Sequence, residues 1–215
     1  MLIVKYVKNG LYIPFVHGII YKKTKNIYLA TIVSLKLVST NHFIWFGHTE
    51  HISPKLVQCK QFVRFTDSGH LASLIYFFRP EFLPIAHNIH FFIMICYWLG
   101  KLLGIKESGN NVDAELIPQV QIISSGLNHG LVYGFLFYDI ISSSNCVFSS
   151  ETLFYSYVWA YTWLFCVYMP WRYITNDEVY SVLSEKTHIF IKITFFIIVN
   201  MIMYLGNYTG KRLTL

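Results

Sequence analysis

A single uncharged run of 23 residues, Leu116–Tyr138, most constrains how this chain can fold. At 1.5 Å per residue, a helix of that length crosses the hydrocarbon core of a bilayer. The run holds Asn128-His129-Gly130 near its centre, and an imidazole at that depth is costly unless it faces the interior of a helix bundle. A structural interpretation, in which His129 bonds a neighbouring carbonyl to hold the bundle together, stands beside a functional one.

Composition indicates that this run is one of several spans. Charged residues make up 13% of the 215 residues and hydrophobic residues 54%, whereas soluble domains average about 25% charged residues. The charges leave gaps long enough for helices, which predicts an all-α polytopic membrane protein, a six-helix transmembrane bundle without strands. The predicted spans are roughly residues 27–47, 61–79, 82–102, 117–141, 152–171 and 188–208.

The second predicted span is the least regular, because residues 61–79 include Arg64 and Asp67. The sequence Arg79-Pro80-Glu81 follows it as a tight polar turn, in which proline stops one helix before the next begins. We therefore expect two helices here. The alternative is one broken or re-entrant element from residue 61 to 100.

The chain shows no repeat and no interdomain linker, so we expect one transmembrane domain at 27–210, with an N-terminal extension at 1–26 and a short tail at 211–215. The extension mixes apolar stretches with five lysines and suits either a helix in the membrane interface or a poorly ordered segment. Five basic residues precede the first span and three follow it, and the first helix usually sets orientation. Both termini are therefore expected in the cytosol, in an endomembrane or plasma-membrane protein. The net charge of +6 indicates membrane-flanking lysines and no nucleic-acid surface, since no contiguous basic face with interleaved aromatics appears.

Several short passages, by their order and spacing, are similar to one family of six-span proteins. The first passage begins the second span, the next two precede the fourth span and lie within it, and the last two belong to the fifth and sixth spans. The passages are Thr66-Asp67, Asp113-Ala-Glu115-Leu-Ile-Pro118, Gly126-Leu127-Asn128-His129-Gly130, Trp163 with Trp171 and Tyr173, and Tyr204-Leu205-Gly206. Over residues 28–210 the chain resembles the androgen-induced gene 1 / FAR-17a family.

That resemblance implies an intramembrane hydrolase of fatty acid esters of hydroxy fatty acids, with a threonine nucleophile matched by Thr66. The family pattern reads Asn-His-x-x-His, and its catalytic histidine is the second one. Here that position is Val132, and His129 matches the first histidine. We therefore expect the ester hydrolysis to be weak or lost, and to rise when Val132 is changed to His.

A threonine hydroxyl needs a base to take its proton during attack, and two histidines could replace the missing one. His129 lies three residues before Val132 on the same helical face. His70 lies one turn after Thr66 and could approach the hydroxyl directly. Asp67 could orient either ring. The candidate catalytic residues are thus Thr66, His129 and His70, acting on a lipid-ester substrate within the bilayer and without cofactor or metal.

Other interpretations remain open at this point. Thr66 begins a predicted helix, where a threonine hydroxyl often caps backbone amides. The pairs His87 with His90 and His48 with His51 suggest a membrane metalloenzyme, although two pairs cannot fill a two-metal site. The Val132 departure favours a third class, a member that has lost catalysis and acts as a membrane scaffold or regulator.

Overall fold

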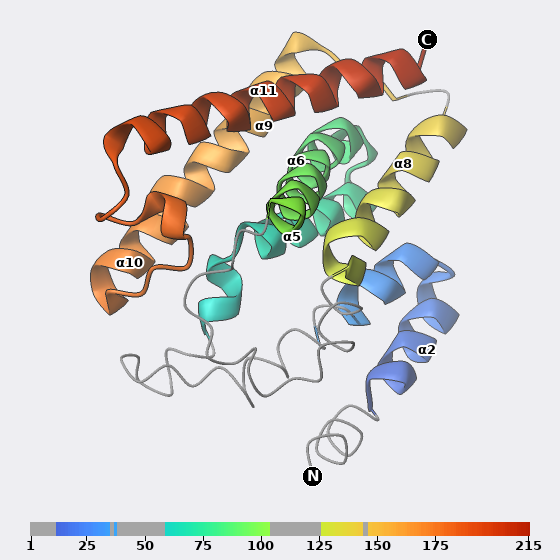
Figure 1. The fold of residues 1–215 in the computed structure, drawn as a ribbon. Coiled ribbons are helices and arrows are strands. Elements are labelled where there is room, and N and C mark those ends of the chain that lie inside the picture. The colour runs from blue at the N-terminus through green and yellow to red at the C-terminus, as the bar shows by residue number, and fades with distance from the viewer. Residues whose placement is uncertain (1–11, 35–36, 38–58, 104–125, 144–145) are drawn as a thin grey trace.

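The structure is a computed structural model that describes residues 12–34, 37, 59–103, 126–143 and 146–215. The regular elements in these ranges are all helical, as the sequence predicted (Figure 1). In chain order they are α2 (Tyr12–Thr24), η1 (Gln61–Val63), α5 (Phe65–Phe78), η2 (Pro80–Phe82), α6 (Leu83–Leu102), η4 (Leu127–Leu131), α8 (Val132–Ser142), α9 (Ser150–Trp163), η5 (Leu164–Tyr168), α10 (Met169–Thr175), η6 (Ser181–Leu183) and α11 (Ile189–Leu213). Residues 27–34 are also helical.

Helix α6 is the centre of the bundle. It packs against α5, α8, α9 and α11, which surround it in Figure 1. Its N-terminal half is almost wholly buried, because small and apolar side chains such as Ala86 and Ile89 let the neighbouring helices approach. Gly69 serves the same purpose on α5, since a Cβ there would overlap Ile93 of α6. The core therefore forms around one helix contacted on several sides.

The break between α5 and α6 falls where the sequence predicted it. Arg79 leaves helical geometry with φ −138° and ψ 87°, and Pro80 begins the short turn η2. The side chains of Arg79 and Glu81 are exposed and lie 3.5 Å apart. Residues 61–79 are not one regular helix, however, because Arg64 is extended and separates η1 from α5.

The N-terminal extension contains the helix α2, and a sharp turn separates it from the first predicted span. Lys25 has a positive φ of 56°, and Asn26 follows it. The side-chain oxygen of Asn26 accepts a hydrogen bond from the amide of Leu29 at 3.0 Å, which caps the helix at residues 27–34. A helix therefore begins at residue 27, where the first span was predicted to start. The predicted tail 211–215 is mostly helical, because α11 runs to Leu213.

The described residues contain two π-helical turns. Residues Ser150 to Thr175 form one unbroken helix that contains the π turn η5 between α9 and α10. The second turn, η4, leads directly into α8. A π turn inserts an extra residue and frequently occurs at functional sites. Neither turn was predicted, because the hydropathy pattern of a π turn differs little from that of an α-helix.

A buried polar network ties α6 to α9 and α11. The side-chain amide of Asn88, which is fully buried, donates to Ser156 Oγ at 3.0 Å and to Asn207 Oδ1 at 3.1 Å. The hydroxyl of Thr152 also donates to Asn207 Oδ1 at 3.2 Å, and Asn207 Nδ2 donates to the carbonyl of Ser149 at 3.2 Å. Such bonds hold helices together where apolar surroundings offer no water.

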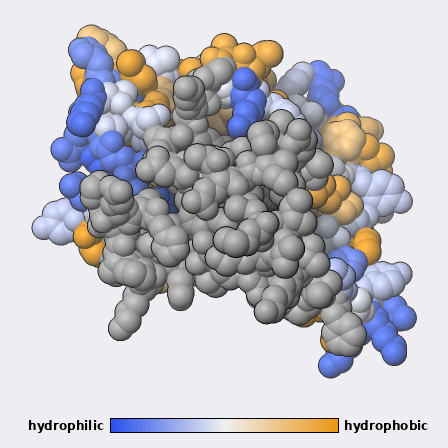
Figure 2. Space-filling view, turned by 60° about the horizontal axis from the view of Figure 1, so that its bottom comes forward, coloured by the Kyte–Doolittle hydropathy of each residue, from blue (hydrophilic) through white to orange (hydrophobic). Residues whose placement is uncertain are grey.

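Two of the described helices are long and apolar enough to cross a membrane, Pro80–Leu102 and Ile189–Leu213. Only 17% of the most apolar stretch of α11 is buried inside the bundle, so most of its apolar side chains face outward. Phe190, Ile193 and Ile197 expose between 48% and 70% of their surface, and groups of hydrophobic residues also lie at the edge of the view in Figure 2. The other predicted spans are shorter as α-helices, are interrupted by π turns, or lie partly outside the described residues.

Candidate functional site

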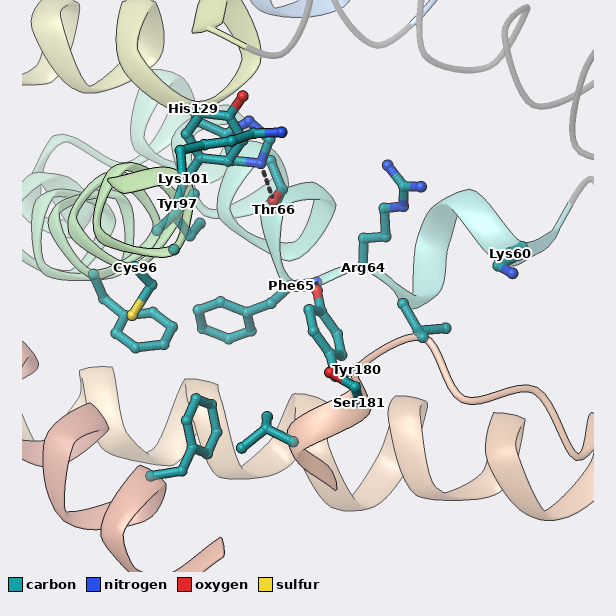
Figure 3. A pocket seen from close by; sticks show the side chains of 16 residues that line it. Lys60, Arg64, Phe65, Thr66, Cys96, Tyr97, Lys101, His129, Tyr180 and Ser181 are labelled. Atoms are coloured by element: carbon teal, nitrogen blue, oxygen red, sulfur yellow. Dashed lines mark hydrogen bonds between the residues drawn. The ribbon is translucent and has the colours of Figure 1, made fainter. Parts of the chain in front are cut away.

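The structure brings Thr66 and His129 into contact. Thr66 lies in the first turn of α5, and its Oγ1 is 3.1 Å from Nε2 of His129 in η4 (Figure 3). The N-cap of α5 is Arg64, and it makes no side-chain capping bond. The hydroxyl of Thr66 therefore faces a potential proton acceptor instead of capping the helix.

The ring of His129 is held from one side by Tyr97 of α6. The two rings are stacked, with centroids 3.9 Å apart and planes within 9° of each other. Lys101 lies one turn further along α6. Its Nζ is 5.5 Å from the centroid of the Tyr97 ring (Figure 3). Stacking restricts rotation of the imidazole, so Tyr97 fixes the direction in which Nε2 points.

Thr66 and His129 line a cavity of about 330 Å³, here named the Thr66 cavity. Among the described residues, most of its wall is apolar and the charged groups are Lys60, Arg64 and Lys101. The lining residues are Lys60, Arg64, Phe65, Thr66, Phe92, Ile93, Cys96, Tyr97, Gly100, Lys101, His129, Val179, Tyr180, Ser181, Val182 and Phe195. An apolar cavity bordered by cations suits an amphiphile with an anionic group.

One wall of the Thr66 cavity is the 176–188 loop, which joins α10 to α11. Tyr180 of this loop accepts a hydrogen bond through its hydroxyl oxygen from the amide of Phe65 at 2.8 Å, next to Thr66. The loop is also fastened by an ion pair, since Lys60 Nζ lies 2.9 Å from Asp177 Oδ2. The Lys60 side chain is 2% exposed and that of Asp177 10%. The loop and the segment that leads into α5 are thus connected at two points.

Two acidic side chains of the 176–188 loop pair with Arg172 of α10. Arg172 lies 2.8 Å from Glu185 and 3.7 Å from Glu178. A hydrogen bond from the side chain of Ser184 lowers the pKa of Glu178 below its ordinary value, and the amide of Glu185 and the charge of Arg172 act in the same direction. These contacts close the end of α10, where Asn176 takes a left-handed conformation with φ 55°.

His70 lies elsewhere in the bundle and is not among the described residues that line the Thr66 cavity. Its ring is buried and stacked on that of His90, with centroids 5.7 Å apart. Asp67 faces His70, with 4.0 Å between Oδ1 and Nδ1. The prediction that His70 could approach the Thr66 hydroxyl is therefore not supported: one turn beyond Thr66, α5 already packs closely on α6, and His70 enters that interface.

Val132, which the resemblance sets against the family's second histidine, is fully buried in the main apolar core. It too is missing from the described lining of the Thr66 cavity. A histidine at this position would enter the core and not the cavity, because the π turn η4 changes the direction of the side chains that follow His129. The gain of activity expected from Val132→His has no support in this geometry.

The histidine pairs considered for a metal do not form a metal centre in the described structure. The described residues contain no group of three or more His, Cys, Asp and Glu that could hold a metal ion. His87 is engaged otherwise, with Nε2 3.3 Å from the hydroxyl of Tyr133 and Nδ1 3.3 Å from Asn88 Oδ1. His48 and His51 lie outside the described residues.

Sequence reasoning did not identify Tyr97 or the 176–188 loop as parts of the site. The spacing of Tyr97 and Lys101, four residues apart at the end of a span, was the available signal. The loop carried none, because its approach to α5 depends on tertiary packing.

Comparison of the chain with protein-family models, curated proteins and solved structures found no match. The resemblance to the androgen-induced gene 1 / FAR-17a family stays a prediction from the sequence.

Proposed function

We propose that the chain is a six-span membrane protein that hydrolyses lipid esters, with Thr66 as nucleophile and His129 as general base. The 3.1 Å contact between Thr66 Oγ1 and His129 Nε2 carries this proposal. A threonine hydroxyl attacks well only when a positioned base removes its proton. The residues also lie in a largely apolar cavity, where a lipid can bind.

The order of the helices supports the six-span arrangement. The start of α5, the end of α6 and the 176–188 loop between α10 and α11 all contribute to the Thr66 cavity. Successive helices thus alternate in direction, as spans joined by loops must. With both termini in the cytosol, the Thr66 cavity would open toward the opposite side of the membrane.

In the proposed reaction, Thr66 Oγ1 attacks the ester carbonyl carbon while His129 Nε2 accepts the hydroxyl proton. This requires the tautomer whose Nε2 is unprotonated. The tetrahedral oxyanion then collapses, the bond to the alcohol oxygen breaks, and His129 returns the proton to that oxygen. Water, deprotonated by His129, releases the acid from the acyl-threonine in a second round. The N-terminal end of α5 and the nearby Arg64 favour the negative charge that develops.

The substrate class follows from the family resemblance and from the cavity. Fatty acid esters of hydroxy fatty acids combine apolar chains with a carboxylate. The Thr66 cavity offers apolar walls together with Arg64 and Lys101.

The test uses the purified full chain in lipid nanodiscs and a panel of fatty acid esters of hydroxy fatty acids, with release of fatty acid as the measurement. Thr66→Ala should abolish turnover. Thr66→Ser should retain it, because the serine hydroxyl occupies the same position. His129→Gln should lower kcat by about 10²–10⁴-fold, the usual contribution of a general base. Intact-mass analysis after rapid quenching should detect an acyl adduct on Thr66.

Matched controls separate chemistry from folding. Thr162 is exposed on α9, and His17 lies on α2 outside the Thr66 cavity. Thr162→Ala and His17→Gln should keep full activity. Equal losses in these controls, or full activity in Thr66→Ala, would refute the catalytic assignment.

The scaffold or regulatory function is the second candidate, and the Val132 departure favours it. It predicts a folded chain that binds lipid ester without turnover. Unchanged lipid binding in Thr66→Ala, together with no hydrolysis in the natural sequence, would support this function over the hydrolase.

A further inference from the structure

Two polar contacts join the same pair of helical segments near their opposite ends. The first is the bond between Thr66, at the start of α5, and His129 in η4. The second lies ten residues further along both segments, where the hydroxyl of Tyr76 donates to Asp139 Oδ2 at 2.9 Å. Segment η4–α8 therefore runs beside α5 in the same direction. At 1.5 Å per residue, the two contacts are about 15 Å apart along α5.

Between these contacts, α5 carries buried polar side chains at helical spacing. His70 and Ser73 follow Thr66 at intervals of four and three residues, and Tyr76 follows after three more, so the four residues lie on one side of the helix. His70 is 2% exposed and Ser73 0%. Neighbours at this spacing have Cβ atoms about 5–6 Å apart, and a hydrogen-bonded water molecule can bridge the polar groups of such neighbours.

Helix α6 places further histidines against this side of α5. The ring of His90 is fully buried and stacks on that of His70, with planes within 22° of each other. Neither ring nitrogen of His90 forms a hydrogen bond with a described side chain, and the same holds for Ser73 Oγ. Buried polar atoms usually bond to protein or to ordered water. Water that bonds to His90 and Ser73 would connect α6 to the polar side of α5.

Polar groups continue from this centre toward both ends of the bundle. Asp67, which follows Thr66, has Oδ1 4.0 Å from Nδ1 of His70. His87 is fully buried one turn before His90, and its Nε2 is 3.3 Å from the hydroxyl of Tyr133 on α8. Asp139 is partly exposed near the end of α8. Ionisable groups buried in this way are costly inside a membrane and usually mark ion or proton pathways.

We propose that a series of these groups carries protons through the bundle between Asp139 and the Thr66 cavity. We name it the polar relay; its members are Asp139, Tyr76, Ser73, His90, His70 and Asp67. The inference rests on the six-span arrangement of the proposed function and does not require ester hydrolysis.

The chemistry of the polar relay needs only protons and water. A neutral imidazole accepts a proton on one ring nitrogen and releases the proton of the other, and rotation of the ring restores the starting tautomer. The hydroxyls of Tyr76 and Ser73 accept one proton and donate their own in the same way. Asp139 exchanges protons with the water at its end of the bundle. A pH difference or a membrane potential supplies the driving force.

The test measures proton flux into sealed vesicles. The purified full chain is reconstituted into phospholipid vesicles containing the pH-sensitive dye pyranine, and a potassium gradient with valinomycin imposes a membrane potential. Wild-type protein should admit protons faster than protein-free vesicles do, while trapped carboxyfluorescein stays inside. Flux equal to that of protein-free vesicles, or flux accompanied by release of the trapped dye, would overturn the proposal.

Near-isosteric substitutions interrupt the polar relay while preserving its shape. Tyr76→Phe removes the hydroxyl, and Asp139→Asn removes the ionisable oxygen. Each should lower proton flux about tenfold or more, since a small rise in the barrier of one transfer step lowers a rate by that factor. Both act at the same contact, so the double variant should be no slower than the slower single variant. Losses that multiply in the double variant would overturn their place in a single series.

His90→Gln interrupts the polar relay from α6 and keeps the test decisive if a variant of the first contact misfolds. It should also lower the flux about tenfold or more, with the unfolding transition of every variant measured alongside. The matched controls are Tyr138→Phe, at an exposed tyrosine beside Asp139, and His17→Gln on α2. Unchanged flux in His90→Gln and Tyr76→Phe, or equal losses in the controls, would overturn the proposal.

Proton flux and ester hydrolysis are measured on the same preparations, which separates this inference from the hydrolase function. Proton flux without hydrolysis would refute the hydrolase and leave the polar relay standing. Hydrolysis without proton flux would refute the polar relay and leave the hydrolase standing. Tyr76 lies ten residues from Thr66, so Tyr76→Phe should lower flux and leave hydrolysis unchanged. Equal loss of both activities would show that Tyr76 only maintains the fold.

Discussion

Removing Lys60 from its buried ion pair should destabilise the chain strongly. Lys60 Nζ lies 2.9 Å from one carboxylate oxygen of Asp177 and 3.0 Å from the other. Lys60→Met leaves the carboxylate of Asp177, 10% exposed, without its cation. Loss of one partner of a buried pair typically costs about 3–5 kcal/mol, because the remaining charge stays desolvated. We expect the free energy of unfolding to fall by about that amount.

The assay is reversible unfolding in mixed micelles, followed by tryptophan fluorescence. Asp177 also accepts a hydrogen bond from Trp171 Nε1 at 3.1 Å, so Asp177→Asn is the appropriate second substitution because the amide keeps an oxygen there. The double variant Lys60→Met with Asp177→Asn should recover most of the lost stability. Lys186→Met, at an exposed lysine of the same loop, should change stability by no more than about 0.5 kcal/mol.

The reasoning would be refuted by either of two results. One is a loss below about 1 kcal/mol for Lys60→Met, the range of exposed ion pairs. The other is a double variant no more stable than the single one. Both would mean that the pair is better hydrated than its burial indicates.

Three further predictions concern other parts of the structure. Tyr97→Ala should lower kcat for ester hydrolysis with little change in KM, because the ring of Tyr97 no longer stacks on His129. Tyr97→Leu should retain part of the kcat, since leucine can still pack on the imidazole. Equal kcat in wild type and Tyr97→Ala would contradict the role of Tyr97 in positioning His129. Gly210→Ala should lower the free energy of unfolding by about 1–3 kcal/mol, because its Cβ would overlap the buried ring of Phe148, and denaturant titration would measure the loss. The folded-state pKa of Glu178 is lowered, chiefly by the hydrogen bond from Ser184. The stability that Glu178 contributes is therefore present above its unfolded pKa and is lost as the pH falls through its folded pKa. Melting curves of wild type and Glu178→Gln should converge in acid, and a difference that stays constant with pH would contradict this.

The positions of the helices were largely predictable, because the gaps between charged residues limit where an apolar helix can lie. Arg79-Pro80-Glu81 marked a real break, and a helix begins at residue 27, where the first span was predicted to start. The helix ends were less predictable. Helix α11 continues through Lys211 and Arg212, since long basic side chains can extend away from an apolar face while the backbone stays helical. The extended conformation of Arg64 was not predictable, because the contacts of the 176–188 loop that favour it are distant in sequence.

The site was predictable only as far as residue type and span allowed. His129 was identified because an imidazole in an apolar span is costly, and Thr66 was identified through the family resemblance. Their contact involves the π turn η4, which the sequence did not indicate. His70 was misplaced because spacing along one helix does not tell which face an adjacent helix covers. The close approach of α5 and α6 at Gly69 decides that.

The network at the end of α11 has a consequence for chemical modification. Asn207-Tyr208-Thr209 is an acceptor sequence for N-linked glycans. A glycan would be attached through Asn207 Nδ2, and in the folded chain that nitrogen donates to the carbonyl of Ser149 while Oδ1 receives two further hydrogen bonds. Sugar addition would have to dismantle the junction of three helices. The folded chain therefore blocks this acceptor sequence, and an unmodified Asn207 would not show which side of a membrane it occupies.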